Sequence, residues 1–215
     1  MAREKTIKEN VITKEKTNST EKAKRSTKIK RVVIEETENV AFPQKIAEQE
    51  PSVSAKKKIL FVASEARPFI ATGGLADVIG SLPKALAEDP TYDIRVVLPL
   101  YADIKPDFRR RMSYLGNIYV PVAWRSQYCG VFSCVESGVT FYFIDNEQYF
   151  KRPNCYGYFD DGERFAFFSR SVLEIMPFID FYPDILHCHD WQAALSAIYL
   201  KTIYIHRPEY RSIRA

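Results

Sequence analysis

The hydrophobic pattern of the chain begins with an apolar run near residue 58. All five residues of 59–63 are apolar, which is typical of a strand covered on both faces in a parallel sheet. After Gly73-Gly74, apolar residues recur at helical spacing, at Leu75, Val78, Ile79, Leu82, Ala85 and Leu86. The pattern therefore predicts a strand, a glycine loop and a helix over residues 58–87.

The same reasoning predicts the elements that follow. Strands are expected over 93–98, 115–124, 128–136, 139–144 and 184–187, and helices over 106–111, 163–176 and from about residue 191. The three strands within 115–144 lack helix-length spacers, so we expect antiparallel strands or hairpins attached to a parallel core. Pro177 should end the helix over 163–176, whose buried stripe is Phe165, Phe168, Val172 and Ile175. We thus predict an α/β fold, with a Rossmann-like, doubly wound, mostly parallel sheet and an antiparallel β insertion.

Composition separates residues 1–55 from the rest of the chain. Residues 1–31 carry 11 Lys and Arg against 4 Glu, and Phe42 is the single aromatic before residue 59. So polar a segment buries too little apolar surface to offset its ordering entropy, and we predict a disordered Lys/Glu-rich tail over 1–55. Basic runs can also bind nucleic acid or membrane surfaces, but glutamates are interspersed and no stacking aromatics accompany them. We expect neither nucleic acid nor membrane as a partner.

Sequence signals for export are weak. No apolar stretch is long enough for a signal sequence or a membrane span, and the early glutamates argue against an organelle transit peptide. Cys129, Cys134, Cys155 and Cys188 show no C-x-x-C spacing, so we expect free thiols of a reducing compartment. These features predict a cytoplasmic protein.

The glycine loop is the first candidate for chemistry. Residues 64–72 form a longer connection than the roughly 2–6 residues usual between a strand and a helix, and they carry Glu65, Arg67 and Thr72. Glycines at a helix N-terminus let backbone N–H groups approach an anion or a sugar. A tight structural turn is the alternative. An NAD-binding domain is disfavoured, because G-x-G-x-x-G and an acidic residue ending the second strand are both absent.

Two later segments are also candidates. Residues 145–165 form a polar, Tyr- and Gly-rich stretch that suits either carbohydrate or a plain exposed loop. His187 and His189 should share one face of the strand over 184–187, and with Asp190 they could bind a metal. No third ligand at suitable spacing is visible, so we expect no metal. Histidines that simply pack in the core are the other alternative.

Four motifs resemble those of bacterial glycogen synthases and plant starch synthases, glycosyltransferase family 5. They are S-E-A-R-P-F-I-A-T-G-G-L over 64–75, P-L-Y over 99–101, Y-F-D-D-G-E-R-F over 158–165 and P-D-I-L-H-C-H-D-W over 183–191. The resemblance implies a GT-B fold, of which residues 56–215 would be the N-terminal catalytic domain, incomplete at its C-terminal end. The second Rossmann-like domain would be missing.

The resemblance also implies a reaction and a set of site residues. The family transfers glucose from ADP-glucose, its donor substrate, to the non-reducing end of an α-1,4-glucan with retention, and no cofactor or metal is implied. His189 and Asp160 would be catalytic. The substrate-binding residues would be Thr72, Gly73, Gly74, Leu75, Tyr101, Arg164, Asp190 and Trp191. The chain departs from the family motif K-T-G-G-L at one position, because Ala71 stands where the family has lysine, and this removes a cation from the phosphate region.

Three functional hypotheses follow. The first is a glucosyltransferase of glycogen or starch synthesis, whose isolated 215-residue chain we expect to be nearly inactive because the family takes cations and the adenine pocket from its second domain. The second is a non-catalytic α-glucan-binding module. The third is a nucleotide-binding α/β protein of another kind, which the second strand already disfavours.

Overall fold

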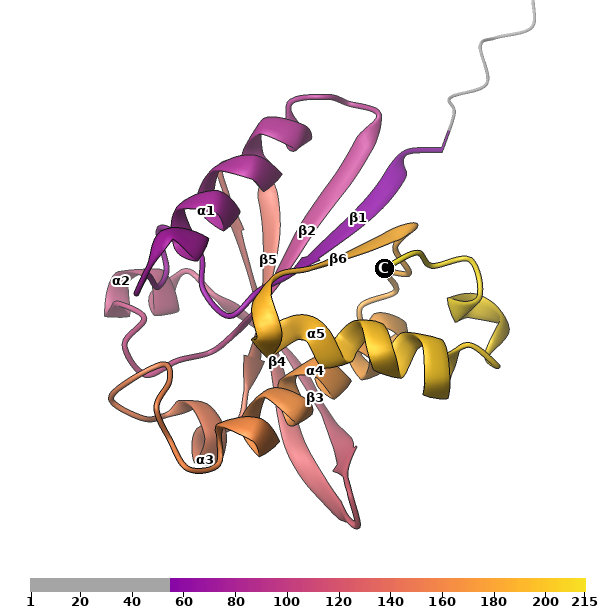
Figure 1. Ribbon diagram of the computed structural model, residues 1–215. Coiled ribbons are helices and arrows are strands. Elements are labelled where there is room, and N and C mark those ends of the chain that lie inside the picture. Colours follow the sequence, from indigo (N-terminus) through magenta and orange to yellow (C-terminus); the bar gives the residue numbers. More distant parts are fainter. Residues whose placement is uncertain (1–54) are drawn as a thin grey trace, which may run out of the picture. The chain divides into compact units, whose positions relative to one another are not determined.

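The computed structural model describes residues 55–215 (Figure 1). The tail predicted over 1–55 lies outside the described residues except for Ala55. The strands are β1 Lys57–Val62, β2 Tyr92–Pro99, β3 Ser113–Val122, β4 Arg125–Glu136, β5 Val139–Asp145 and β6 Ile185–Cys188. The α-helices are α1 Gly74–Ala87, α2 Pro106–Arg110, α3 Glu147–Phe150, α4 Asp161–Phe178 and α5 Asp190–Tyr199. A π-helical turn, Leu200–Tyr204, and a 3-10 turn, Pro208–Tyr210, follow α5.

The strands form one six-stranded sheet in the order β3-β4-β5-β2-β1-β6. Strands β5, β2, β1 and β6 are parallel, whereas β3 and β4 pair antiparallel with each other and β4 pairs antiparallel with β5. The predicted α/β class with a mostly parallel sheet is confirmed. One part of the prediction is corrected: β5 belongs to the parallel core, because β3 and β4 together reverse the chain twice before β5 pairs with β2.

Helices cover both faces of the sheet (Figure 1). Helix α1 packs against β2 and β5, while α4 packs against β3 and α5. Between α2 and the sheet, the ring of Phe69 packs edge-on against Phe108 and Phe143 and lies 4.9 Å from Phe141. The predicted stripe of α4 is fully buried on the other face. Pro177 lies inside the last turn of α4, one residue before its end, so it marks the helix end only approximately.

The face that α1 presents to the sheet differs from the predicted one. Ala76, Ile79 and Pro83 are buried, whereas Val78 and Leu82 are exposed. Small residues bring the helix close to the loop that precedes it: a Cβ at Gly80 would lie 2.9 Å from the Cβ of Arg67. The buried face of α1 is therefore the one that allows the closest packing, and it is not the face with the largest apolar side chains.

The parallel strands end at a common edge of the sheet, called here the carboxyl edge. Val62 at the end of β1 pairs with Cys188 at the end of β6 and with Val97 near the end of β2. The loops after these strands therefore emerge side by side, where α/β proteins commonly bind ligands. No helix within residues 55–215 is long and apolar enough to cross a membrane.

Candidate functional site at the carboxyl edge

Glu65 organises the glycine loop that follows β1. Its carboxylate is only 4% exposed and accepts hydrogen bonds from the Thr72 hydroxyl at 2.9 Å, the Gly73 N–H at 3.3 Å and the Thr72 N–H. The Tyr156 hydroxyl donates to the same carboxylate at 3.1 Å and lies 2.7 Å from the Ser64 hydroxyl. A carboxylate that accepts so many hydrogen bonds fixes the loop against α1 and ties it to the segment after α3.

The first turn of α1 is open on its outer side. Gly73 is the N-cap residue and donates its N–H to the Glu65 carboxylate, but as a glycine it has no side chain to cap the N–H groups of the turn that follows. A Cβ at Gly73 or Gly74 would meet nothing within 4 Å, so neither the glycines nor their neighbours fill this space. The first N–H groups of a helix lack partners within it and attract negative charge. The cation of this loop is Arg67, whose guanidinium pairs with the exposed carboxylate of Asp77 in α1.

His189 lies at the same edge, directly after β6. Its N–H donates to the Val62 carbonyl at 2.9 Å, so its backbone is joined to the end of β1. Its ring stacks on Phe61 at 5.7 Å and lies 4.4 Å from the ring of His187. The Nε2 atom is buried and has no hydrogen-bond partner among the described residues. Burial, with a smaller contribution from His187, lowers the pKa of His189, while Asp190 opposes the shift. The imidazole is therefore neutral near pH 7.

Asp190 and Trp191 begin α5 beside this histidine. Asp190 has φ +59°, a left-handed conformation that a residue with a side chain adopts at a cost of about 1–3 kcal/mol. Strain of this kind concentrates at functional sites. Trp191 is 55% exposed and packs edge-on against Phe165, which in turn lies 5.9 Å from the Tyr156 ring. A row of aromatic rings thus links the start of α5 to the glycine loop.

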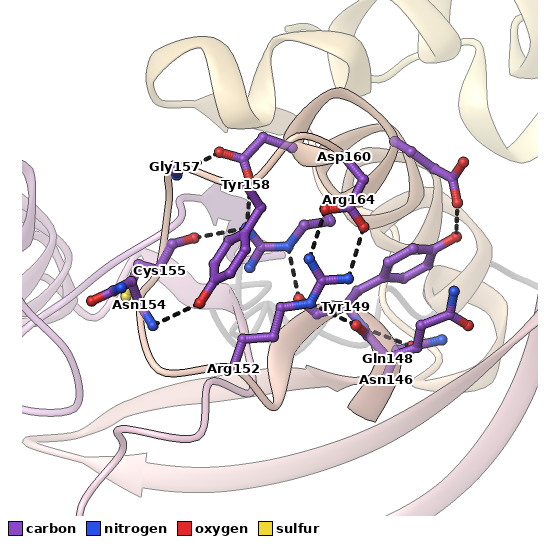
Figure 2. Close-up of polar contacts among 12 residues, drawn as sticks. Asn146, Gln148, Tyr149, Arg152, Asn154, Cys155, Gly157, Tyr158, Asp160 and Arg164 are labelled. Atoms are coloured by element: carbon purple, nitrogen blue, oxygen red, sulfur yellow. Dashed lines mark hydrogen bonds and ion pairs between the residues drawn. The ribbon is translucent and has the colours of Figure 1, made fainter.

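The segment between α3 and α4 is held together by two arginines (Figure 2). Arg152 forms a bidentate ion pair with Asp160, at 2.6 and 2.7 Å. Arg164 donates to the carbonyls of Tyr149 at 2.7 Å and Cys155 at 3.1 Å, and it also pairs with Asp161. The hydrogen bonds close the loop onto the N-terminus of α4.

These contacts change how two predicted site residues are understood. Arg164 is 0% exposed, so its guanidinium cannot touch a substrate here and instead holds the loop. Asp160 is partly exposed, but Arg152 occupies both of its oxygens and lowers the pKa of the carboxyl. Within residues 55–215, no hydrogen bond joins Asp160 to the glycine loop or to His189. A catalytic role for Asp160 stays a prediction.

Tyr101 also differs from its predicted role as a substrate-binding residue. It is buried, its ring packs edge-on against Phe150, and its hydroxyl has no hydrogen-bond partner among the described residues. Burial raises the pKa of this hydroxyl well above its usual value. Tyr101 thus lies beneath the edge, in the core.

The structure therefore brings most of the predicted residues to one edge and adds two. The loop after β1 and the start of α1 provide Thr72, Gly73, Gly74 and Leu75, and the residues that follow β6 are His189, Asp190 and Trp191. Glu65 and Tyr156, which join the two loops, were not predicted as site residues. Their contact spans 91 positions, and no local pattern signals it.

Metal and thiol chemistry find no support in residues 55–215. No group of three His, Cys, Asp or Glu side chains gathers there around a position for a metal ion. The four cysteines are free thiols, as predicted. Burial raises the pKa of Cys129 and Cys155 to about 12, so these thiols are unreactive at neutral pH.

Comparisons with known proteins point to one family. The family model described as starch synthase catalytic domain matches residues 58–215. This chain is 53% identical to the glycogen synthase of Desulforamulus reducens and 50% identical to that of Geobacillus stearothermophilus. Each alignment extends over 157 residues, which are 73% of this chain and 32% of the relative. The catalytic domain of starch synthase IV from Arabidopsis thaliana, solved with ADP and acarbose, matches 75% of this chain with TM-score 0.67 and 28% identity, and 33% of that chain is covered. The chain spans about a third of the length of the relatives it matches.

Proposed function

Because residues 58–215 place the chain in the starch synthase catalytic domain family, we propose that it forms part of a glucosyltransferase of glycogen or starch synthesis. The enzyme would transfer glucose from ADP-glucose to the non-reducing end of an α-1,4-glucan, with retention. One observation carries this proposal: the open first turn of α1 and a neutral imidazole whose Nε2 has no partner within residues 55–215 lie at the same edge of one sheet. The Arabidopsis relative was solved with ADP and acarbose, which supports a nucleotide and a glucan as ligands.

The donor would bind against the loop that Glu65 holds. The N–H groups at the start of α1 would face the pyrophosphate, where the helix dipole favours negative charge. Because Ala71 provides no charge, Arg67 is the cation that this loop offers, although Asp77 neutralises part of it. A family member with a lysine at position 71 should hold the donor more tightly.

His189 would hold a hydroxyl of the transferred glucose. A neutral imidazole can accept or donate one hydrogen bond at Nε2, and this atom has no partner among residues 55–215. Because Nε2 is buried, a sugar hydroxyl would reach it after a shift of the side chains that cover it, and the hydrogen bond would then need little further reorganisation during the reaction. Asp190 and Trp191 would border the same sugar, and we propose no resident cofactor or metal. Free thiols suit a reducing compartment, so we place the reaction in the cytoplasm.

A chimera tests this function. Residues 58–215 would replace the matched segment of the Desulforamulus reducens glycogen synthase, and glucose transfer from ADP-glucose to glycogen would be measured. We expect the chimera to be active and the 215-residue chain alone to be nearly inactive, because missing positioning and electrostatic stabilisation each cost several kcal/mol of barrier. A folded chimera that binds glycogen but transfers no glucose would favour the alternative, a non-catalytic α-glucan-binding module. Measurable transfer by the chain alone would contradict the second expectation.

A further inference from the structure

The β3–β4 hairpin extends past the carboxyl edge, beside the site. Gly130 of β4 pairs with Asp145, the last residue of β5, and with Asn117 of β3, so residues 118–129 project beyond the core strands (Figure 1). An ion pair at 2.6 Å between Arg125 and Glu163 anchors the hairpin to the start of α4. The hairpin is therefore held against the start of α4 and projects from the carboxyl edge next to the end of β5.

The two faces of this hairpin differ. The face toward α4 is buried through Val120, Cys129 and Val131. The opposite face includes Tyr114, Asn117, Tyr119, Tyr128 and Phe132, and these five residues are called here the tyrosine face. Its three tyrosines are 53%, 65% and 36% exposed, in chain order.

The aromatic rings of the tyrosine face are already ordered by contacts with one another. Tyr119 and Tyr128 pair across the strands, with ring centroids 6.4 Å apart, and Tyr114 lies 5.0 Å from Phe132. The Tyr114 hydroxyl donates to the Asn117 side chain at 3.1 Å. A ligand that covers these rings would therefore lose little affinity to ordering them.

The tyrosine face continues into a hollow at the carboxyl edge. The Tyr128 hydroxyl and the Asp145 carboxylate lie 2.7 and 3.2 Å from the position a Cβ would take at Gly130, so the glycine permits their close approach. Asp145 in turn lines a hollow of about 310 Å³ together with Leu100, Ala102, Arg109, Glu147 and Lys151. Leu100 follows β2, the strand next to β1, so this hollow lies between the tyrosine face and the glycine loop.

We propose that the hollow and the tyrosine face bind a stretch of α-1,4-glucan that runs from the reaction site across the hairpin. The inference rests on the proposed function and adds a binding surface outside the site. Tyrosine offers a flat apolar ring for the C–H face of a glucose unit and a hydroxyl for hydrogen bonds, and Asn117 adds an amide. The five residues of the tyrosine face are uncharged, and the hollow beside it is lined by two acidic and two basic residues, Asp145, Glu147, Arg109 and Lys151, whose charges offset one another. A surface without net charge suits an uncharged polymer better than a polyanion.

Affinity electrophoresis of the 215-residue chain in native gels with and without glycogen tests this surface. The double variant Tyr119→Ala/Tyr128→Ala should bind glycogen about tenfold more weakly, because two stacking contacts are lost. Tyr119→Phe/Tyr128→Phe should retain most of the affinity. Val135→Ala is the matched control: Val135 is exposed on β4 but points to the opposite face, so affinity should not change. Melting temperatures of all variants show whether they fold.

Three results would overturn the inference. First, glycogen could retard the folded wild-type chain and the folded alanine double variant equally. The proposed function would then still stand, because the chimera tests it separately. The wild-type chain could fail to bind glycogen. Finally, sedimentation could show a dimer that the alanine double variant dissociates, and the tyrosine face would then be a contact between copies of the chain.

Discussion

Replacing His189 with alanine in the chimera should lower kcat by about 10²–10³-fold, the usual loss when one preorganised hydrogen-bonding group is removed from an active site. Nothing in the described part of the chain pairs with Nε2 of this residue, so its hydrogen bond is left for the sugar. His206→Ala is the matched control, because His206 is exposed and lies outside the candidate site. Steady-state kinetics of both variants would check this. Equal kcat for His189→Ala and the unchanged chimera would remove His189 from the mechanism.

The pH dependence of this histidine has a defined sign. Its pKa in the folded chain lies below the ordinary value of 6.5, so the folded state binds fewer protons than the unfolded state. The stability that the neutral ring contributes is present above the unfolded pKa and is lost as pH falls through the folded one. Activity should also fall as the pH is lowered, because a protonated ring cannot accept a hydrogen bond at Nε2. An NMR titration of the ring would show a lowered pKa in the wild type and a smaller shift in His187→Ala, since His187 contributes to it.

Replacing Glu65 with alanine should lower the free energy of unfolding by about 3 kcal/mol, because several donors around a buried carboxylate lose their acceptor together. The affected donors are the N–H groups of Thr72 and Gly73 and the hydroxyls of Thr72 and Tyr156. Since these groups shape the glycine loop, ADP-glucose affinity should fall as well. Glu65→Gln keeps one acceptor oxygen and should lose less stability.

Denaturant unfolding and ADP-glucose titration would measure both effects of Glu65→Ala. Asp77→Asn serves as the matched control, because Asp77 belongs to an exposed ion pair in the same region, where such pairs contribute about 1 kcal/mol or less. A Glu65→Ala variant as stable as Asp77→Asn, with the same ADP-glucose affinity as wild type, would show that the buried carboxylate does not hold the loop.

Much of the fold could be predicted from apolar runs and spacing. The apolar run at 59–63 predicted a strand that is buried on both faces. The positions of Gly and Pro and the periodicity of apolar residues predicted the strands and helices that follow it. The place of β5 could not be predicted, since a series of strands without helical spacers is compatible with several pairings. The buried side of α1 was also missed, because Ala76 and Pro83 pack closely despite their small apolar surface.

The site could be predicted only in part, because some of its contacts join segments that are far apart in the sequence. His189 and Gly73 follow parallel strands, so a shared edge could be anticipated from the sequence. The roles of Arg164 and Asp160 depend on contacts within a folded loop, where Arg152 and several carbonyls compete for them. The Glu65–Tyr156 hydrogen bond joins distant segments and has no sequence signature.

The central claim is that the glycine loop and the end of β6 together bind one sugar nucleotide. Titration of ADP-glucose into the isotopically labelled 215-residue chain, followed by NMR, tests it most directly. We predict that the amide signals of Gly73 and Gly74 and the ring signal of His189 shift together, with a single dissociation constant. Saturating ADP-glucose that shifts only one of these segments, or shifts them with different dissociation constants, would contradict the claim.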